Sequence, residues 1–240
     1  MIGADITVMF SITRNLYEYA PAVIQNLVET NPRVYRIYLF IEDDEFPYPI
    51  DKRVRIININ DYPQYIKGGP NENNPWTRMA FTRCFVSKLL LEEKILYFDL
   101  DLFFYSGLER LWGIEFDGNY MCGVIEANAV SHSKKDYINT GVLLMDLRAM
   151  RLNHVDYDIC KFIESKKLTF PDQDAINSVC AGRIKFINHS FNNSKITQKG
   201  EEENIPLTIS HVSQIKPWDK RSNFYWKWKA YDDKIKGREE

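Results

Sequence analysis

Apolar segments with strand character alternate with segments of helical periodicity along most of the chain. The strand-like segments are rich in β-branched and aromatic residues; they are 5–11, 35–41, 54–59, 95–98, 120–125, 142–145, 184–187 and 207–209. The helical pattern covers 19–29, 76–91 and 157–166, and a further helix is expected to begin near Asp172. This alternation predicts an α/β fold with a Rossmann-like mixed, mostly parallel sheet that carries helices on both faces.

The size and composition of the chain narrow its function. Its 240 residues suit one large α/β domain, and 45% hydrophobic residues are enough for a globular core. Lysine and arginine number 31 against 33 acidic residues, a balance that argues against a general nucleic-acid binder. Four widely separated cysteines fit reduced, mostly buried thiols. The sequence has no signal-peptide pattern and no apolar run near the roughly 20 residues of a membrane span, so we expect a soluble, cytoplasmic protein.

Two carboxylates, Asp99 and Asp101, follow the apolar run 95–98 with only a leucine between them. Residues i and i+2 of an extended segment point to the same side, so both carboxylates can bind one hard divalent cation. Two other interpretations remain open on these residues alone. The pair could be an ordinary solvated turn, or Asp99 could be the nucleophile of a haloacid-dehalogenase-like phosphatase.

Three further segments carry polar side chains next to predicted strands or helices. They read YINTGVLLMDLR at 137–148, PDQDAIN at 171–177 and HVSQIKPW at 211–218. Taken singly, each has an ordinary structural interpretation: a turn before a core strand, the first turn of a helix, and a histidine after a strand. In the last segment Lys216 follows His211 closely, which places a metal ligand and a phosphate-binding cation in one short loop.

Together, in this order and spacing, FDLD, NTGVLLMDL, DQDAIN and HVSQIKPW resemble the family 8 glycosyltransferases. The resemblance covers residues 5–220 and includes the helical segment TRMAFTRCFVSKLL ahead of the aspartates. It implies the GT-A fold and a retaining, metal-dependent transferase. The phosphatase interpretation fits less well, because Leu102 and Phe103 follow Asp101 where that motif expects a small residue or threonine.

The resemblance also implies roles for single residues. Asp99 and Asp101 would bind Mn²⁺ or Mg²⁺ and the UDP-sugar, with His211 as the third metal ligand. Lys216 would contact the diphosphate, and Arg83 would contact the donor sugar or the diphosphate.

Further residues would surround the donor sugar and its base. Asn139 and Asp172 would border the sugars, and Gln173 would lie near the anomeric carbon, which makes Asp172 and Gln173 the expected catalytic residues. Glu126 falls near the position of a donor-contacting acid. The end of the first strand, over residues 11–17, would hold the uracil and ribose; its candidate residues are Ser11, Thr13 and Asn15.

The expected activity is therefore transfer of galactose or glucose from a UDP-sugar to a glycan, a lipid-linked acceptor or a glycoprotein. Gln173 is a poor nucleophile, so attack on the same face of the sugar is favoured over double displacement. The alternatives are the phosphatase that uses Asp99, or a non-catalytic relative that binds nucleotide sugars.

Two peripheral segments carry hypotheses of their own. The aromatic and basic segment 223–240 could dock on the inner face of a membrane that carries the acceptor, or it could form a helix that caps the sheet with its aromatic residues. The segment 63–75, rich in proline, glycine and asparagine, is expected to be a poorly ordered loop that closes over the donor, or else an ordinary surface loop with no part in binding.

Overall fold

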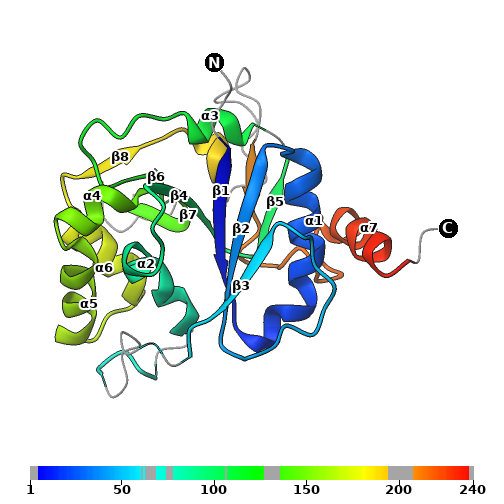
Figure 1. Cartoon of the computed structure of the whole chain (residues 1–240), viewed down its shortest axis with the longest axis horizontal. Coiled ribbons are helices and arrows are strands. Elements are labelled where there is room, and N and C mark those ends of the chain that lie inside the picture. The colour runs from blue at the N-terminus through cyan, green and yellow to red at the C-terminus, as the bar shows by residue number, and fades with distance from the viewer. Residues whose placement is uncertain are drawn as a thin grey trace.

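The computed structural model describes residues 5–60, 62, 69–73, 78–105, 107–126, 136–193 and 208–237. Its centre is a seven-stranded sheet in the order β3-β2-β1-β4-β7-β6-β8 (Figure 1). The strands are β1 (Ile6–Ser11), β2 (Val34–Ile41), β3 (Val54–Asn58), β4 (Lys94–Phe98), β6 (Met121–Ile125), β7 (Ile138–Asp146) and β8 (Ile184–Phe186). Only β7 runs antiparallel to both of its neighbours. The predicted mixed, mostly parallel sheet is confirmed.

Helices cover both faces of this sheet (Figure 1). One face carries α1 (Ala20–Thr30), α3 (Leu108–Trp112) and α7 (Tyr225–Ile235). The other carries α2 (Thr82–Leu89), α4 (Leu147–Leu152), α5 (Val155–Ser165) and α6 (Pro171–Val179). Successive residues of β4 point to opposite faces of the sheet, so Phe98 is buried in the core on the first face and Tyr97 in the core on the second. A strand buried on both faces is apolar throughout, as the run 95–98 is.

Strand β7 begins earlier than the sequence indicated. It includes Asn139, Thr140 and Gly141, whose polar character predicts a turn before a strand at 142–145. The register of β6 against β7 shifts between Gly123 and Ile125, opposite this polar stretch. Such irregularities redirect side chains next to functional sites. Because β7 is antiparallel to β4, its polar first half lies beside the carboxyl end of β4.

A second, two-stranded sheet pairs β5 (Leu102–Phe104) with β9 (Ile209–His211). Neither β5 nor the helices α3 and α4 were predicted. The helix expected over 76–91 is a 3₁₀ helix, η2 (Arg78–Phe81), followed by α2. Two other 3₁₀ helices are η1 (Arg14–Tyr19) and η4 (His189–Phe191). The pairing of Leu102 with His211 joins the aspartate segment to a part of the chain more than a hundred residues away.

The C-terminal helix α7 packs on α1 (Figure 1), and the ring of its Tyr231 lies beside Phe103 of β5. Trp228 is buried in the α1-side core, whereas Trp226 is 78% exposed. The lysines of α7 all have partners: Lys227 lies over aromatic rings, Lys229 pairs with Asp233 and Lys234 with Glu29. No helix among the described residues is long and apolar enough to span a membrane.

Most of the segment 63–75 lies outside the described residues, and with it the expected donor-dependent closure. Within it, residues 69–73 are described, and Asn71 is buried there. Its side chain donates to the backbone oxygens of Ile163 and Lys166 and accepts from Leu168 N–H. This part of the segment is therefore fixed to the end of α5.

Candidate active site

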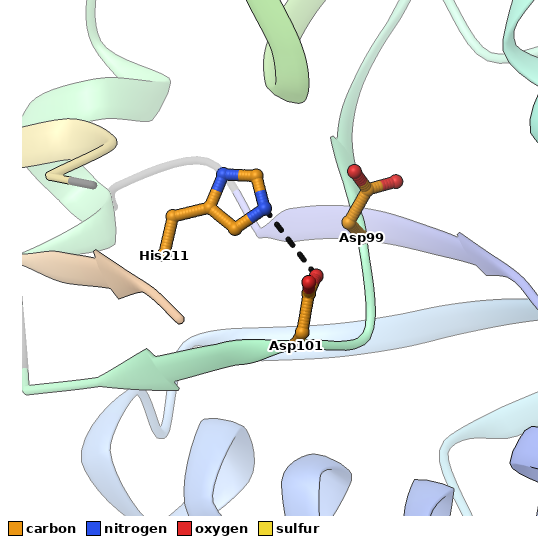
Figure 2. Close-up of side chains that lie close together, drawn as sticks. All are labelled: Asp99, Asp101 and His211. Carbon is orange, nitrogen blue, oxygen red and sulfur yellow. Dashed lines mark ion pairs between the residues drawn. The ribbon is translucent and has the colours of Figure 1, made fainter. Parts of the chain in front are cut away.

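Asp99, Asp101 and His211 converge at the carboxyl end of β4 (Figure 2). Each offers one ligand atom, and these atoms lie within 4.8 Å of one another. The Nε2 atom of His211 is 3.3 Å from Asp101 Oδ1. Asp101 and His211 are buried, while the Asp99 side chain keeps 28% of its surface exposed. The three side chains thus form a small polar centre that opens on one side.

Backbone pairing brings these three residues together. The Asp99 N–H donates to Gly141 O (2.8 Å), and Val212 N–H donates to Asp101 O (2.8 Å). A Cβ atom at Gly141 would lie 2.4 Å from Cε1 of His211 and 2.8 Å from Oδ2 of Asp99. The close approach of strand β7 to this centre therefore requires glycine at position 141.

Lys216 and His211 hold the Asp101 carboxylate in its ionised form. Lys216 Nζ donates to Asp101 Oδ2 at 2.6 Å, and His211 faces the other oxygen. Burial raises the pKa of Asp101, but His211 and Lys216 outweigh it and lower the pKa below its ordinary value. Burial lowers the pKa of His211, and the nearby Asp101 carboxylate reverses this and raises it.

The three converging residues fit a hard divalent cation. Carboxylate oxygens suit Mg²⁺ and Mn²⁺, and an imidazole ligand suits a transition metal such as Mn²⁺. Octahedral coordination at about 2.1 Å separates neighbouring ligand atoms by about 3 Å, close to the 3.3 Å between His211 Nε2 and Asp101 Oδ1. Gly141 leaves the space beside these atoms open where a side chain would fill it.

A line of hydrogen bonds supports His211 from behind; we call His211, Asn192, Asn139 and Glu126 the histidine cluster. The Nδ1 atom of His211 lies 3.0 Å from Asn192 Oδ1. Asn192 Nδ2 donates to Asn139 Oδ1 (2.9 Å), and Asn139 Nδ2 donates to Glu126 Oε2 (2.7 Å). Glu126, a loosely placed candidate in the sequence, thus joins the site through Asn139. Asn192 had no signal in the sequence.

A second network, on the other side of β7, centres on the buried Arg83; we call Arg83, Tyr97, Thr140, Asp172 and Gln173 the arginine cluster. Arg83 Nη2 donates to Asp99 Oδ1 (2.7 Å), and Nη1 donates to Thr140 O (2.6 Å). The guanidinium lies over the Tyr97 ring, 4.1 Å from its centroid. Tyr97 also donates its hydroxyl proton to Asp99 Oδ1 (2.7 Å). Arg83 therefore orients Asp99 as well as lying near the predicted donor site.

The two predicted catalytic residues meet at Thr140. Asp172 Oδ2 lies 3.4 Å from Arg83 Nε and accepts from the Thr140 hydroxyl (3.2 Å). Gln173 Oε1 accepts from Thr140 N–H at 3.1 Å, which fixes the orientation of its amide. Burial raises the pKa of Asp172, with Arg83 opposing the shift. Thr140 carries no signal of this role in the sequence beyond its place in NTG.

The predicted uracil and ribose residues lie at the same edge of the sheet. Strand β1 is parallel to β4, and the pairing of Phe10 with Phe98 brings Ser11 alongside Asp99. Ser11 Oγ donates to Met79 O (2.8 Å) and lies 2.9 Å from Thr82 Oγ1, so it is directed to the start of α2.

Thr13 and Asn15 are at the start of η1. The hydroxyl of Thr13 donates to Asn15 Oδ1 at 2.5 Å, and Asn15 is exposed. Their roles toward a base stay predictions.

The comparisons with known proteins identify the class. The model of glycosyl transferase family 8 matches residues 7–222, and the chain belongs to this family. Among solved structures, an active-site glutamine-to-glutamate mutant of LgtC superposes with a TM-score of 0.74 at 18% identity, covering 97% of this chain and 95% of that one. This match confirms the predicted GT-A fold. The family decides against the phosphatase interpretation of Asp99.

Two relatives from Escherichia coli are lipopolysaccharide glucosyltransferases. Lipopolysaccharide glucosyltransferase WaaO of strain K12 is 24% identical over 191 residues, which are 69% of this chain and 56% of the relative. A lipopolysaccharide 1,2-glucosyltransferase is 26% identical over 158 residues, 55% of this chain and 46% of the relative. The chain spans about half the length of the curated relatives it matches.

Proposed function

We propose that this chain is a metal-dependent hexosyltransferase that moves galactose or glucose from a UDP-sugar to a glycan, with retention of configuration. The observation that carries the proposal is the convergence of Asp99, Asp101 and His211, with Lys216 bonded to the same centre. Membership of family 8 and the two lipopolysaccharide glucosyltransferases among its relatives favour a lipopolysaccharide-type or other lipid-linked acceptor over a glycoprotein.

In this proposal Asp99, Asp101 and His211 would hold Mn²⁺ or Mg²⁺, which would supply positive charge to stabilise the diphosphate leaving group. Lys216 extends that positive charge toward the diphosphate. Asn139 and Asp172 border the sugars, and Ser11, Thr13 and Asn15 contact the nucleoside.

Gln173 lies beside the anomeric carbon in this proposal. Its amide oxygen already accepts from Thr140 N–H, and a neutral amide held in this way is a weak nucleophile. This supports attack by the acceptor on the face from which UDP departs, with a phosphate oxygen of the leaving group taking the acceptor's proton. Asp172, buried and paired with Arg83, orients groups and does not attack.

We also propose that residues 1–240 act as one glycosyltransferase domain, with a core over about 1–220 and an extension over 221–240. The exposed Trp226 is the part of α7 best placed to meet an acceptor-bearing membrane. The cytoplasmic location at the inner face of a membrane stays a prediction.

The activity is tested by incubating the protein with UDP-galactose or UDP-glucose, with and without Mn²⁺, and measuring free UDP. Metal-dependent release of UDP from one donor, increased by a glycan acceptor, is the expected result. The anomeric signal of the product then reports retention, because the donor bond is α. Binding of UDP-sugar without turnover over any acceptor would instead indicate a non-catalytic relative.

The metal assignment is tested by Asp101→Asn. The substitution is nearly isosteric, so the variant should fold, but a neutral amide replaces the anion that the cation requires. Binding of ligand at about 100 times its Kd stabilises a protein by about 2.7 kcal/mol, and we expect the Mn²⁺-dependent part of this stabilisation to vanish in the variant. Thermal unfolding with UDP, with and without Mn²⁺, measures it. Equal metal-dependent stabilisation in both proteins would contradict the assignment.

A further inference from the structure

The His211 imidazole has a different acceptor beside each of its nitrogens. Asn192 Oδ1 lies 3.0 Å from Nδ1, and Asp101 Oδ1 lies 3.3 Å from Nε2. A neutral imidazole carries one proton, and the nitrogen that carries it cannot bind a cation. Since Nε2 is the nitrogen that faces Asp101, the proton must lie on Nδ1 if His211 is to serve as a ligand at this centre.

The hydrogen-bond network determines which atom of Asn192 faces the ring. The backbone N–H of Gly141 can only donate, and it points at the side-chain oxygen of Asn139 (2.9 Å). The atom of Asn192 that approaches this same oxygen at 2.9 Å must therefore be its NH₂ group. The oxygen of Asn192 is then left for His211, and it accepts a hydrogen bond from Nδ1–H.

The other end of the network agrees with this direction. The NH₂ group of Asn139 faces the carboxylate of Glu126 at 2.7 Å, where only a donor fits. Backbone bonds hold Asn192 in place, because its neighbour Asn193 donates to Ile209 O (3.0 Å) and accepts from His211 N–H (2.9 Å). Asn192 is 4% exposed and His211 is 5% exposed, so water has little access to replace this contact.

We propose that Asn192 is a positioning residue that keeps the proton of neutral His211 on Nδ1 and leaves Nε2 as the ligand atom. The inference rests on the proposed metal dependence of this site. Without the Asn192 amide, only the Asp101 carboxylate remains of the two acceptors beside the ring, and the proton then moves to Nε2. The ring would then have to change its tautomer before it could bind a cation. Partners of this kind behind a ligating histidine strengthen metal binding.

The tautomer can be measured without metal or substrate. Proton–nitrogen correlation spectra of protein with isotope-labelled histidine, recorded at a pH that leaves the ring neutral, distinguish a proton on Nδ1 from one on Nε2. The His211 signal is assigned by its loss in His211→Gln. We expect the Nδ1–H form in the wild type and a shift toward the Nε2–H form in Asn192→Leu, which removes the amide at similar volume.

Metal affinity is the second readout, measured by calorimetry with Mn²⁺ and UDP. We expect Asn192→Leu to weaken Mn²⁺ binding by about 10- to 100-fold. Asn192→Asp keeps an acceptor for Nδ1–H, so it should retain both the Nδ1–H tautomer and most of the affinity. Asn31→Leu is the matched control, because Asn31 is also a buried amide that bonds to backbone, at Leu27 and Leu108. It should leave both readouts unchanged.

Two results would overturn the inference. One is an Nε2–H tautomer in the wild type, which decides the matter even if Asn192→Leu does not fold. Another is a folded Asn192→Leu variant with the wild-type tautomer, whatever its Mn²⁺ affinity. If the wild type binds no Mn²⁺ and His211→Gln changes nothing, the proposed metal function fails, and the tautomer measurement still tests the role of Asn192.

Discussion

The arginine cluster and the histidine cluster lie on opposite sides of β7, and their polar side chains differ in where their hydrogen bonds are directed. In the arginine cluster, the nitrogens of Arg83 donate to acceptors within the protein, at Ala80, Thr140 and Asp99. In the histidine cluster, bonds run away from the centre through Asn192, and the ligand atoms of His211, Asp99 and Asp101 face one another. The charged groups of the arginine cluster are thus paired with one another and with the backbone. In the histidine cluster, the ligand atom of His211 is left facing those of Asp99 and Asp101.

Asp99 contacts the arginine cluster and is also a member of the ligand centre. Its Oδ1 accepts from Arg83 and Tyr97, while its Oδ2 lies close to the Cα of Gly141, where an added Cβ would meet it. The arginine cluster therefore holds one oxygen so that the other keeps its direction. We therefore expect substitutions in the two clusters to affect different measurements, stability for the arginine cluster and ligand binding for the histidine cluster.

The largest expected effect on stability is that of Arg83→Met. It removes the cation and leaves Asp172 buried without its charge partner, and breaking a buried pair in this way costs about 3–5 kcal/mol. The free energy of unfolding from urea denaturation, without ligand, measures the loss. Arg148→Met is the control, because its pair with Glu93 is exposed and should contribute at most about 1 kcal/mol. A loss for Arg83→Met no larger than that of the control would show that the arginine cluster does not support the fold.

Gly141→Ala should act chiefly on the ligand centre formed by Asp99, Asp101 and His211. The added methyl would overlap His211 and Asp99, so the variant should lose Mn²⁺ binding, while overpacking costs about 1–3 kcal/mol of stability. Calorimetric titration with Mn²⁺ and UDP, beside urea denaturation, separates the two effects. Gly182→Ala is the control, since its positive φ of 74° makes alanine unfavourable at a position with no neighbour within 4 Å.

Unchanged Mn²⁺ affinity in Gly141→Ala would contradict the view that the close approach of β7 shapes the ligand centre. Loss of affinity in Gly182→Ala as well would mean that destabilisation alone, and not the overlap at the site, explains the result.

Asp99 and Asp101 could be predicted as a cation-binding pair because they directly follow the apolar run that forms β4. His211 was assigned to the same centre through the resemblance to family 8 glycosyltransferases. The mixed sheet followed from the alternation of apolar runs. The aspartate pair and the sheet depend on local periodicity, which a single sequence records.

The supporting residues could not be predicted in this way. Asn192 reaches His211 through contacts between distant segments, which local pattern does not encode. The polar residues that open β7 predict a turn, yet they continue the strand because Asn139 and Thr140 find hydrogen-bond partners on opposite sides of it. Strand β5 was not predicted, because its three residues directly follow the aspartates and pair with the distant β9. Arg83 was identified, but its bonds to Asp99 and Thr140 were not.

Thr140→Val should give the smallest effect on stability and the sharpest separation of the clusters. Valine keeps the shape of threonine but removes the hydroxyl that links Arg83, Asp172 and Gln173, a loss of about 1 kcal/mol. Asp172 and Gln173 are then less firmly held beside the donor, so the rate of UDP release should fall. The affinity for Mn²⁺ should stay at the wild-type value, because the histidine cluster is untouched.

Steady-state release of UDP and calorimetric Mn²⁺ binding, measured on the same preparation, test this separation. Thr30→Val is the matched control: its hydroxyl bonds to Asn26 O and Leu27 O within α1, remote from either cluster, and its loss should change neither readout. If Thr140→Val weakened Mn²⁺ binding as much as it slowed turnover, the two sides of β7 would be one coupled site. Their division into a supporting and a ligand-binding cluster would then be wrong.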